Sequence, residues 1–327
     1  MMQDNNSQIL LAEDLRKSYG LREALRGLSF SLQAGRVLGF LGPNGAGKTT
    51  SIRILTTIME PDTGHFSIDG ISYRYPEKIR RKIGVLPESL GFPRHITGLE
   101  YLTYYSQLYG RSAADAKARS RTLIEEVGLT ARANSLIGTY SHGMRQRIGI
   151  ARALVNDPVV VFLDEPTLGL DPRGQQELLA LIQRIAREHA TGVILCSHSL
   201  SEIEGICDDV VILSSGQVVA KGPVKEVIGQ TQRNVLRVQV AGPRVEDAHQ
   251  VLAALPKVLR VTPAPDLSGW LRVELVAPAD GVSPEDYQVN NDVLSALIRS
   301  NIPILSFEAE GGRLQDVFLY LTEEVIR

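Results

Sequence analysis

The residues best suited to chemistry in this 327-residue chain form the stretch Gly42-Pro43-Asn44-Gly45-Ala46-Gly47-Lys48-Thr49-Thr50. A short apolar run at 37–41 precedes it, and apolar residues recur at helical spacing after it. A strand, a glycine-rich turn and a helix start together aim backbone N–H groups at an anion. Lys48 can reach the β- and γ-phosphates of a nucleotide, and the Thr49 hydroxyl can bind Mg²⁺. We assign nucleotide contacts to Gly42, Asn44, Gly45, Gly47, Lys48, Thr49 and Thr50. A chance match is the alternative, and the complete set of glycines and flanks argues against it.

A second candidate lies at the end of the apolar run 159–163, where Asp164 and Glu165 follow directly. Ligands of parallel sheets bind at the carboxyl ends of the strands, so two acids there are well placed. Asp164 can hold Mg²⁺, and Glu165 can polarise a water aimed at the γ-phosphate. Adjacent acids are common, and the pair carries weight only because the chain also has a phosphate-binding loop.

The elements that must position these residues follow from the apolar runs at 37–41, 159–163, 193–196 and 210–213. Continuous rather than alternating apolar runs indicate strands covered on both faces, and helical patterns separate them. We therefore expect an α/β fold with a parallel core sheet. Residues 8–35 predict antiparallel strands instead, with turns at 19–20 and 34–35, and 63–70 is a further hairpin candidate.

The sequence divides into two predicted domains. Residues 1–228 form the larger one, with an inserted helical subdomain at about 93–156. A polar linker is expected at 229–234 and a small α+β domain at 235–327, where residues 236–240 and 271–275 alternate as half-buried strands.

Composition excludes several classes of protein. The net charge is −2, from 35 basic and 37 acidic residues, so nothing favours nucleic acid as a partner. No apolar run approaches the roughly 18 residues that span a bilayer, and the first residues lack a signal-peptide pattern, so we expect a cytosolic protein. The two cysteines, Cys196 and Cys207, fit a reducing compartment. Their spacing with His198 matches no common zinc pattern, which favours core thiols.

Five motifs stand in order along the chain. After the phosphate-binding loop come Tyr140-Ser141-His142-Gly143-Met144, the acid strand, Gly169-Leu170-Asp171, and His198 at the end of the next strand. Ser141 alone would be read as a helix N-cap and Asp171 as another. Taken together, the motifs resemble the ATPases of ATP-binding-cassette (ABC) transporters over about residues 8–228. The resemblance implies the P-loop cassette fold and ATP hydrolysis with Mg²⁺.

The resemblance also implies roles for residues outside the loop. Ser141 and Gly143 would contact the γ-phosphate of ATP held by an opposite subunit, in a head-to-tail dimer, and Asp171 would signal across it. His198 would contact the γ-phosphate and orient the attacking water with Glu165, and Tyr19 would stack on adenine. Lys48, Glu165 and His198 are thus the expected catalytic residues.

Two departures mark this chain within the family pattern. Glu88 stands where glutamine is usual, at a position that touches Mg²⁺ and the lytic water, so Thr49, Asp164 and Glu88 are the expected metal ligands. His142 and Met144 depart from the usual Leu-Ser-Gly-Gly-Gln. Both departures resemble bacterial drug-resistance, sodium-export and gliding-motility exporters.

The resemblance favours a transporter motor that powers export through a separate membrane permease, paired with a second ATPase subunit and peripheral to the cytoplasmic face of the membrane. The homodimer is favoured, and a heterodimer stays open. A soluble ABC ATPase acting on nucleic acid or the ribosome is the alternative, and a non-hydrolysing regulator is a third. Tyrosines at 101, 104, 105 and 109 are either subdomain core or a surface for the permease.

Overall fold

The computed structural model describes residues 8–88, 91–230, 235–263, 269–276, 284–310 and 313–323. The chain forms two compact units. The first comprises the described residues up to Val224 together with 321–323, and the second is Lys225–Tyr320. The predicted boundaries at 228 and 235 stay a prediction, and most of the expected linker lies outside the described residues.

A six-stranded sheet forms the centre of the first unit, in the order β10-β9-β3-β8-β7-β6. Its strands are β3 (Val37–Leu41), β6 (Ile83–Leu86), β7 (Val160–Asp164), β8 (Gly192–Cys196), β9 (Asp209–Ser214) and β10 (Gln217–Pro223). All neighbours pair in parallel except β10, which pairs antiparallel with β9. Every residue of β3 and β8 is buried, which explains their unbroken apolar sequences. The expected parallel core sheet is therefore confirmed.

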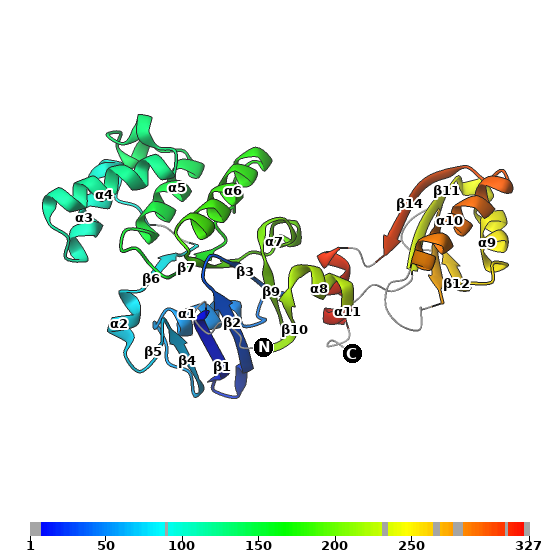
Figure 1. The fold of residues 1–327 in the computed structure, drawn as a ribbon, viewed down its shortest axis with the longest axis horizontal. Coiled ribbons are helices and arrows are strands. Elements are labelled where there is room, and N and C mark those ends of the chain that lie inside the picture. The colour runs from blue at the N-terminus through cyan, green and yellow to red at the C-terminus, as the bar shows by residue number, and fades with distance from the viewer. Residues whose placement is uncertain are drawn as a thin grey trace. The chain divides into compact units, whose positions relative to one another are not determined.

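Helices α1 (Lys48–Leu55), α6 (Pro172–Glu188) and α7 (Leu200–Ile206) follow β3, β7 and β8 along the chain. Parallel strands need such crossovers. Because each of these strands ends at the same edge of the sheet, the segments that follow them, including the phosphate-binding loop and the Asp164–Glu165 pair, are brought together (Figure 1).

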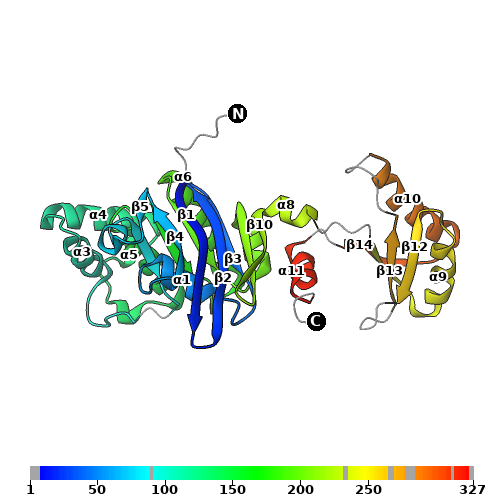
Figure 2. The same cartoon turned by 90° about the horizontal axis from the view of Figure 1, so that it is seen from below.

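An antiparallel sheet with the order β2-β1-β4-β5 accompanies the core sheet. Strands β1 (Gln8–Tyr19) and β2 (Arg22–Gln33) form a long hairpin, which Figure 2 shows along its length. Beside them lie β4 (Thr63–Ile68) and β5 (Ile71–Ser72). One apolar core joins both sheets, with Phe30 and Phe40 in edge contact at 5.0 Å between ring centroids.

The region between β6 and β7 is helical, as expected. It contains α3 (Gly98–Leu108), α4 (Ala113–Glu126), α5 (His142–Ala153) and two short 3₁₀ turns, Thr130–Arg132 and Ile137–Thr139. Thr97 and Glu100 form a capping box that begins α3. At the other end of this region α5 lies against β6, where a Cβ at Gly84 would stand 2.0 Å from the Ala153 carbonyl oxygen. Helix α2 (Pro76–Arg80) precedes β6.

The second unit is an α+β fold, which confirms the predicted class of this region. Its antiparallel sheet has the order β12-β13-β11-β14. The strands are β11 (Val235–Val240), β12 (Val258–Pro263), β13 (Trp270–Leu275) and β14 (Ile304–Glu310), and the helices include α9 (Val245–Ala253) and α10 (Pro284–Arg299). Val238, Leu271 and Val293 belong to its own apolar core. The chain passes from one unit to the other within α8 (Val224–Gln230) and again within α11 (Leu314–Glu323).

The hairpin candidate at 63–70 is a hairpin that extends two residues further than expected. Strand β4 pairs antiparallel with β5, so the hairpin ends at Ser72. Asp69 and Gly70 form its turn, with φ values of 52° and 72°, as a two-residue hairpin turn requires. Both cysteines are buried and free, as predicted for core thiols. Within the described residues, no helix combines the length and apolar character needed to cross a membrane.

Candidate nucleotide-binding site

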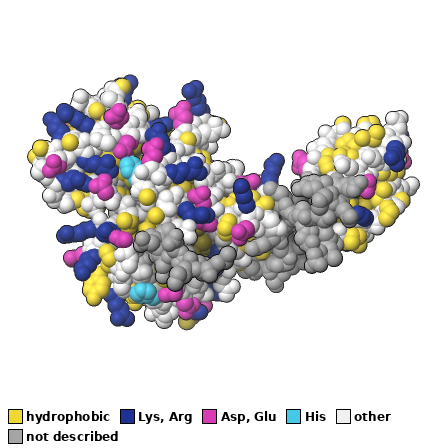
Figure 3. Space-filling model, in the orientation of Figure 1, with side chains coloured by type: hydrophobic (Ala, Val, Ile, Leu, Met, Phe, Trp, Pro, Cys, Tyr) yellow, Lys and Arg dark blue, Asp and Glu magenta, His cyan; other side chains and the backbone are white. Residues whose placement is uncertain are grey.

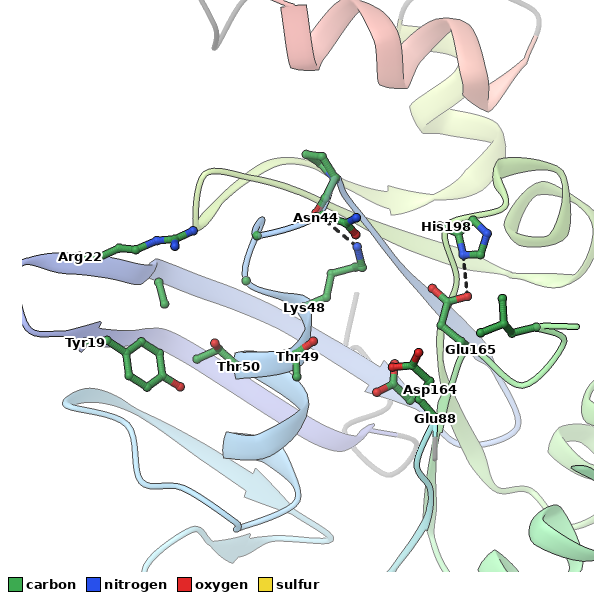
Figure 4. A pocket seen from close by; sticks show the side chains of 15 residues that line it. Tyr19, Arg22, Asn44, Lys48, Thr49, Thr50, Glu88, Asp164, Glu165 and His198 are labelled. Carbon is green, nitrogen blue, oxygen red and sulfur yellow. Dashed lines mark hydrogen bonds and ion pairs between the residues drawn. The ribbon is translucent and has the colours of Figure 1, made fainter. Parts of the chain in front are cut away.

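The glycine-rich loop between β3 and α1 has a backbone that only glycine accepts at key points. Gly45 and Gly47 have φ values of 83° and 111°. A Cβ at Gly47 would lie 2.7 Å from the Ala24 carbonyl oxygen, in a strand of the other sheet. The loop is therefore fixed by its fit against β2, and its residues line a pocket (Figure 4).

Lys48 is the first residue of α1, and its ammonium bends back over the loop. Its Nζ donates to the Gly42 carbonyl oxygen at 2.5 Å and to the Pro43 carbonyl oxygen at 3.3 Å. The N-cap residue Gly47 offers no side-chain cap to the helix. The first N–H groups of α1 thus have no side-chain acceptor at this cap and, with Lys48, form a positive surface that suits phosphate.

Two carboxylates, Asp164 and Glu88, point into the same pocket next to Thr49 (Figure 4). Burial raises the pKa of Asp164, and the nearby charge of Glu88 raises it further, while Lys48 opposes both effects. A cation would favour the ionised form of Asp164, whose charge is disfavoured by burial and by the neighbouring carboxylate. This negative charge, together with a hydroxyl oxygen from Thr49, fits a hard divalent cation such as Mg²⁺.

Glu165 has a backbone conformation that is unusual for glutamate, with a φ of 48°. Its N–H donates to the Cys196 carbonyl oxygen at 2.9 Å, which holds the residue at the end of β7 against β8. Strained conformations of this kind cost of order 1–3 kcal/mol and concentrate at functional sites. The result is a carboxylate that projects into the pocket with only 16% of its side chain exposed.

His198 lies at the end of β8 and donates from Nδ1 to Glu165 Oε2 at 2.8 Å. When Glu165 is ionised, this hydrogen bond requires a proton on Nδ1, because a carboxylate can only accept. Burial raises the pKa of Glu165, and the charge and hydrogen bond of His198 partly offset that rise. The histidine therefore keeps the buried acid available as a proton acceptor at a lower pH than burial alone would allow.

The pocket contains most of the residues expected from the sequence. Tyr19 lines it at the end of β1, and so do Asn44, Gly45, Gly47, Lys48, Thr49, Thr50, Glu88, Asp164, Glu165 and His198. Gly42 supplies the carbonyl that holds Lys48. Ser141, Gly143 and Asp171 do not line it. Ser141 caps α5 by accepting from the Met144 N–H at 3.3 Å, and Asp171 caps α6 by accepting from the Gly174 N–H at 3.3 Å.

Arg22 also lines the pocket, and the sequence reasoning missed it. It extends from the start of β2 towards the loop (Figure 4), and a Cβ at Gly45 would lie 3.2 Å from its guanidinium. Among the described residues it has no ion-pair partner in the structure. A basic residue three positions after Tyr19 was the only available signal. Arg22 reaches the pocket only because the hairpin turn after β1 returns β2 to it. Ala24, Pro43 and Leu168 complete the lining.

This arrangement of a strand, a glycine loop with a helical lysine, and acids at the carboxyl edge of a parallel sheet defines a P-loop nucleoside-triphosphate hydrolase. Comparison with known proteins narrows the class. The family described as ABC transporter matches residues 25–168. The chain belongs to this family, as one of its ATP-binding, ATP-hydrolysing proteins.

Similar proteins include the linearmycin resistance ATP-binding protein LnrL of Bacillus subtilis, 31% identical over 98% of this chain and 100% of LnrL. The daunorubicin/doxorubicin resistance ATP-binding protein DrrA of Streptomyces peucetius is 34% identical over 94% of this chain and 90% of DrrA. A solved ATP-binding subunit of an ABC transporter is 33% identical, with a TM-score of 0.60, over 68% of this chain and 92% of that chain.

Proposed function

We propose that this chain powers export through a separate membrane permease, and that two such ATPase subunits enclose ATP and Mg²⁺ between them. The observation that carries the proposal is the Glu165–His198 pair beside Lys48 and the phosphate-binding loop. Export is supported by relatives named for antibiotic resistance that match this chain from end to end. We place the protein at the cytoplasmic face of the membrane, held there by the permease.

The predicted alternative, a role on nucleic acid or the ribosome, has no comparable support. Lys and Arg side chains are interspersed with Asp and Glu over the visible face of the first unit (Figure 3). A nucleic-acid surface would instead concentrate basic residues.

In this proposal each residue has a distinct task. The loop N–H groups and Lys48 hold the β- and γ-phosphates, and Tyr19, a residue that is 46% exposed, receives the adenine. Glu165 accepts the proton of the attacking water, and His198 orients that acid and meets the γ-phosphate through Nε2. Mg²⁺, held by Thr49, Asp164 and Glu88, would neutralise charge on the phosphates.

The second subunit completes the site. Ser141 and Gly143 lie outside the pocket of their own chain, which is consistent with a contact to nucleotide held by a partner. The first turn of α5 contains no acid, so its N–H groups can face a phosphate. Asp171 follows at the start of α6 and is assigned to the same interface.

The permease surface is assigned to α3. Tyr101 is 2% exposed and belongs to the core, where its hydroxyl accepts from Arg152. Tyr104 is 56% exposed and Tyr109 45% exposed, so these two tyrosines can contact a membrane partner. The tyrosines thus divide between the two roles that the sequence left open, and the docking role is a proposal.

The proposal is tested by co-expressing the chain with any multi-span membrane protein that a neighbouring gene encodes. We expect the two to purify together, and magnesium-dependent ATP hydrolysis by the complex to respond to transported compounds. Tyr104→Ala serves as the docking control and should purify with less of the membrane protein. ATPase activity in a chain that binds no membrane protein would contradict the transport role.

Replacing Arg22 with glutamine is expected to weaken ATP binding about tenfold, because a charge-assisted hydrogen bond to phosphate is lost. Equilibrium dialysis with ATP and with adenosine measures the effect, and adenosine binding should not change. Arg26→Gln is the matched control, since Arg26 is on the same strand but pairs with Glu23 at 3.4 Å. Equal affinities for ATP in the two variants would contradict the assignment.

A further inference from the structure

His142 is the residue that departs most from the family pattern, and its side chain has a defined partner. Its Nε2 lies 2.8 Å from the Leu168 carbonyl oxygen, so Nε2 carries a proton and donates it. The two residues are 26 positions apart in the sequence. The bond therefore joins the first turn of α5 to the segment that links Glu165 to Asp171.

The same two segments also approach each other closely at two glycines. A Cβ at Gly169 would lie 3.5 Å from Nε2 of the His142 ring, and a Cβ at Gly143 would lie 3.5 Å from the Leu170 side chain. Gly169 has a φ of 77°, which shapes the chain around the imidazole. The start of α5 consequently packs closely against residues 168–170.

Residues 165–170 are also held from the opposite side. The buried Thr167 hydroxyl donates to Glu202 at 2.9 Å, and Ser197, next to His198, donates to the same carboxylate oxygen at 2.8 Å. Glu202 is only 7% exposed, so this connection excludes water. Residues 165–170, which begin with the catalytic acid, are thus held at two points. Thr167 is bonded to Glu202, and Leu168 is bonded to His142.

The consequence concerns two different nucleotides. Leu168 lines the pocket of its own chain. Ser141 and Gly143, on either side of His142, lie outside that pocket and are assigned above to nucleotide held by a partner. His142 therefore connects a wall of one pocket directly to the surface assigned to the other.

We propose that His142 is a positioning residue that couples the two ATP sites of a pair: its hydrogen bond to Leu168 makes α5 and residues 168–170 move together. This inference rests on the head-to-tail pairing proposed above. Closure onto one nucleotide then sets the geometry beside the other. Packed interfaces switch between discrete arrangements, so a change at one ATP site alters the other. Hydrolysis of ATP by the pair therefore becomes cooperative.

A matched pair of amide variants tests the inference. Glutamine at 142 places its amide N–H near the position of Nε2, whereas asparagine is one methylene too short to reach Leu168. In the Glu165→Gln background, we expect His142→Gln to pair in Mg-ATP as the parent does, and His142→Asn and His142→Ala to pair about tenfold more weakly. Sedimentation equilibrium measures the pairing.

In chains that keep Glu165 and therefore hydrolyse ATP, the Hill coefficient of hydrolysis for ATP should fall towards one in His142→Asn. It should stay unchanged in His142→Gln. ATP binding by the single chain should stay within about twofold in each variant. His249→Ala is the control, because His249 makes the same kind of bond, to the Val261 carbonyl oxygen at 3.2 Å, in the second unit.

The outcomes separate the two proposals. If the Glu165→Gln parent stays monomeric with Mg-ATP, the pairing fails and the inference fails with it. If the parent pairs, and His142→Asn matches His142→Gln in pairing and Hill coefficient, only the inference fails. Equal losses of melting temperature and ATP binding in both amide variants would show a merely structural histidine, which also overturns it.

Discussion

Replacing Glu165 with glutamine is expected to lower the maximal rate of ATP hydrolysis about 10²–10⁴-fold while ATP binding persists. Glutamine has the same shape and can still accept the hydrogen bond from His198, but it cannot take a proton from water. The loop and Lys48, which hold the phosphates, are untouched. Phosphate release at saturating Mg-ATP, together with ATP binding by dialysis, measures the split.

Glu188→Gln serves as the control for the loss of one acidic charge, since Glu188 is an exposed acid at the end of α6. Its rate should stay within about twofold of the parent. A Glu165→Gln variant that retained most of its turnover would show that another group activates the water, and a variant that lost ATP binding would show that Glu165 shapes the pocket.

Replacing Gly47 with alanine is expected to abolish ATP binding. A φ of 111° is strained for any residue with a Cβ, and the added carbon would meet the Ala24 carbonyl oxygen at 2.7 Å and the Leu25 side chain at 2.8 Å. The loop must shift, so its N–H groups no longer converge on phosphate. We expect ATP affinity to fall at least about a hundredfold, with a cost of at least about 2 kcal/mol in the free energy of unfolding.

Gly205→Ala provides the contrast, because Gly205 lies in helix α7 and a Cβ there would meet no atom within 4 Å. That variant should bind ATP normally and gain about 0.5–1 kcal/mol of unfolding free energy from helix propensity. Calorimetric titration with ATP and denaturant unfolding compare the two. Unchanged ATP affinity in Gly47→Ala would remove the loop from the binding site.

The sequence predicted the parts of the site in which neighbouring residues carry the chemistry. The phosphate-binding loop is contiguous, and Asp164 and Glu165 follow an apolar strand, so their positions follow from the parallel sheet alone. Ser141 was readable as a helix cap for the same local reason.

What escaped prediction depends on contacts between distant segments. Arg22 gains its place only because the β1–β2 hairpin returns to the phosphate-binding loop. The bond from His142 to Leu168 joins residues that no local pattern relates. The hairpin at 63–72 was predicted two residues too short because β5 has only two residues, too few to give an alternating pattern.

The bond from Lys48 to its own loop has a consequence for how the nucleotide arrives. Two of the three N–H donors of the ammonium are already bonded to carbonyl oxygens, so an incoming phosphate replaces one set of hydrogen-bond acceptors with another. The charge of Lys48 still attracts the phosphate, but the net gain from the exchanged hydrogen bonds is smaller than their gross strength. A whole nucleotide, which also reaches Tyr19 and the rest of the pocket, is therefore expected to bind more tightly than a lone inorganic anion.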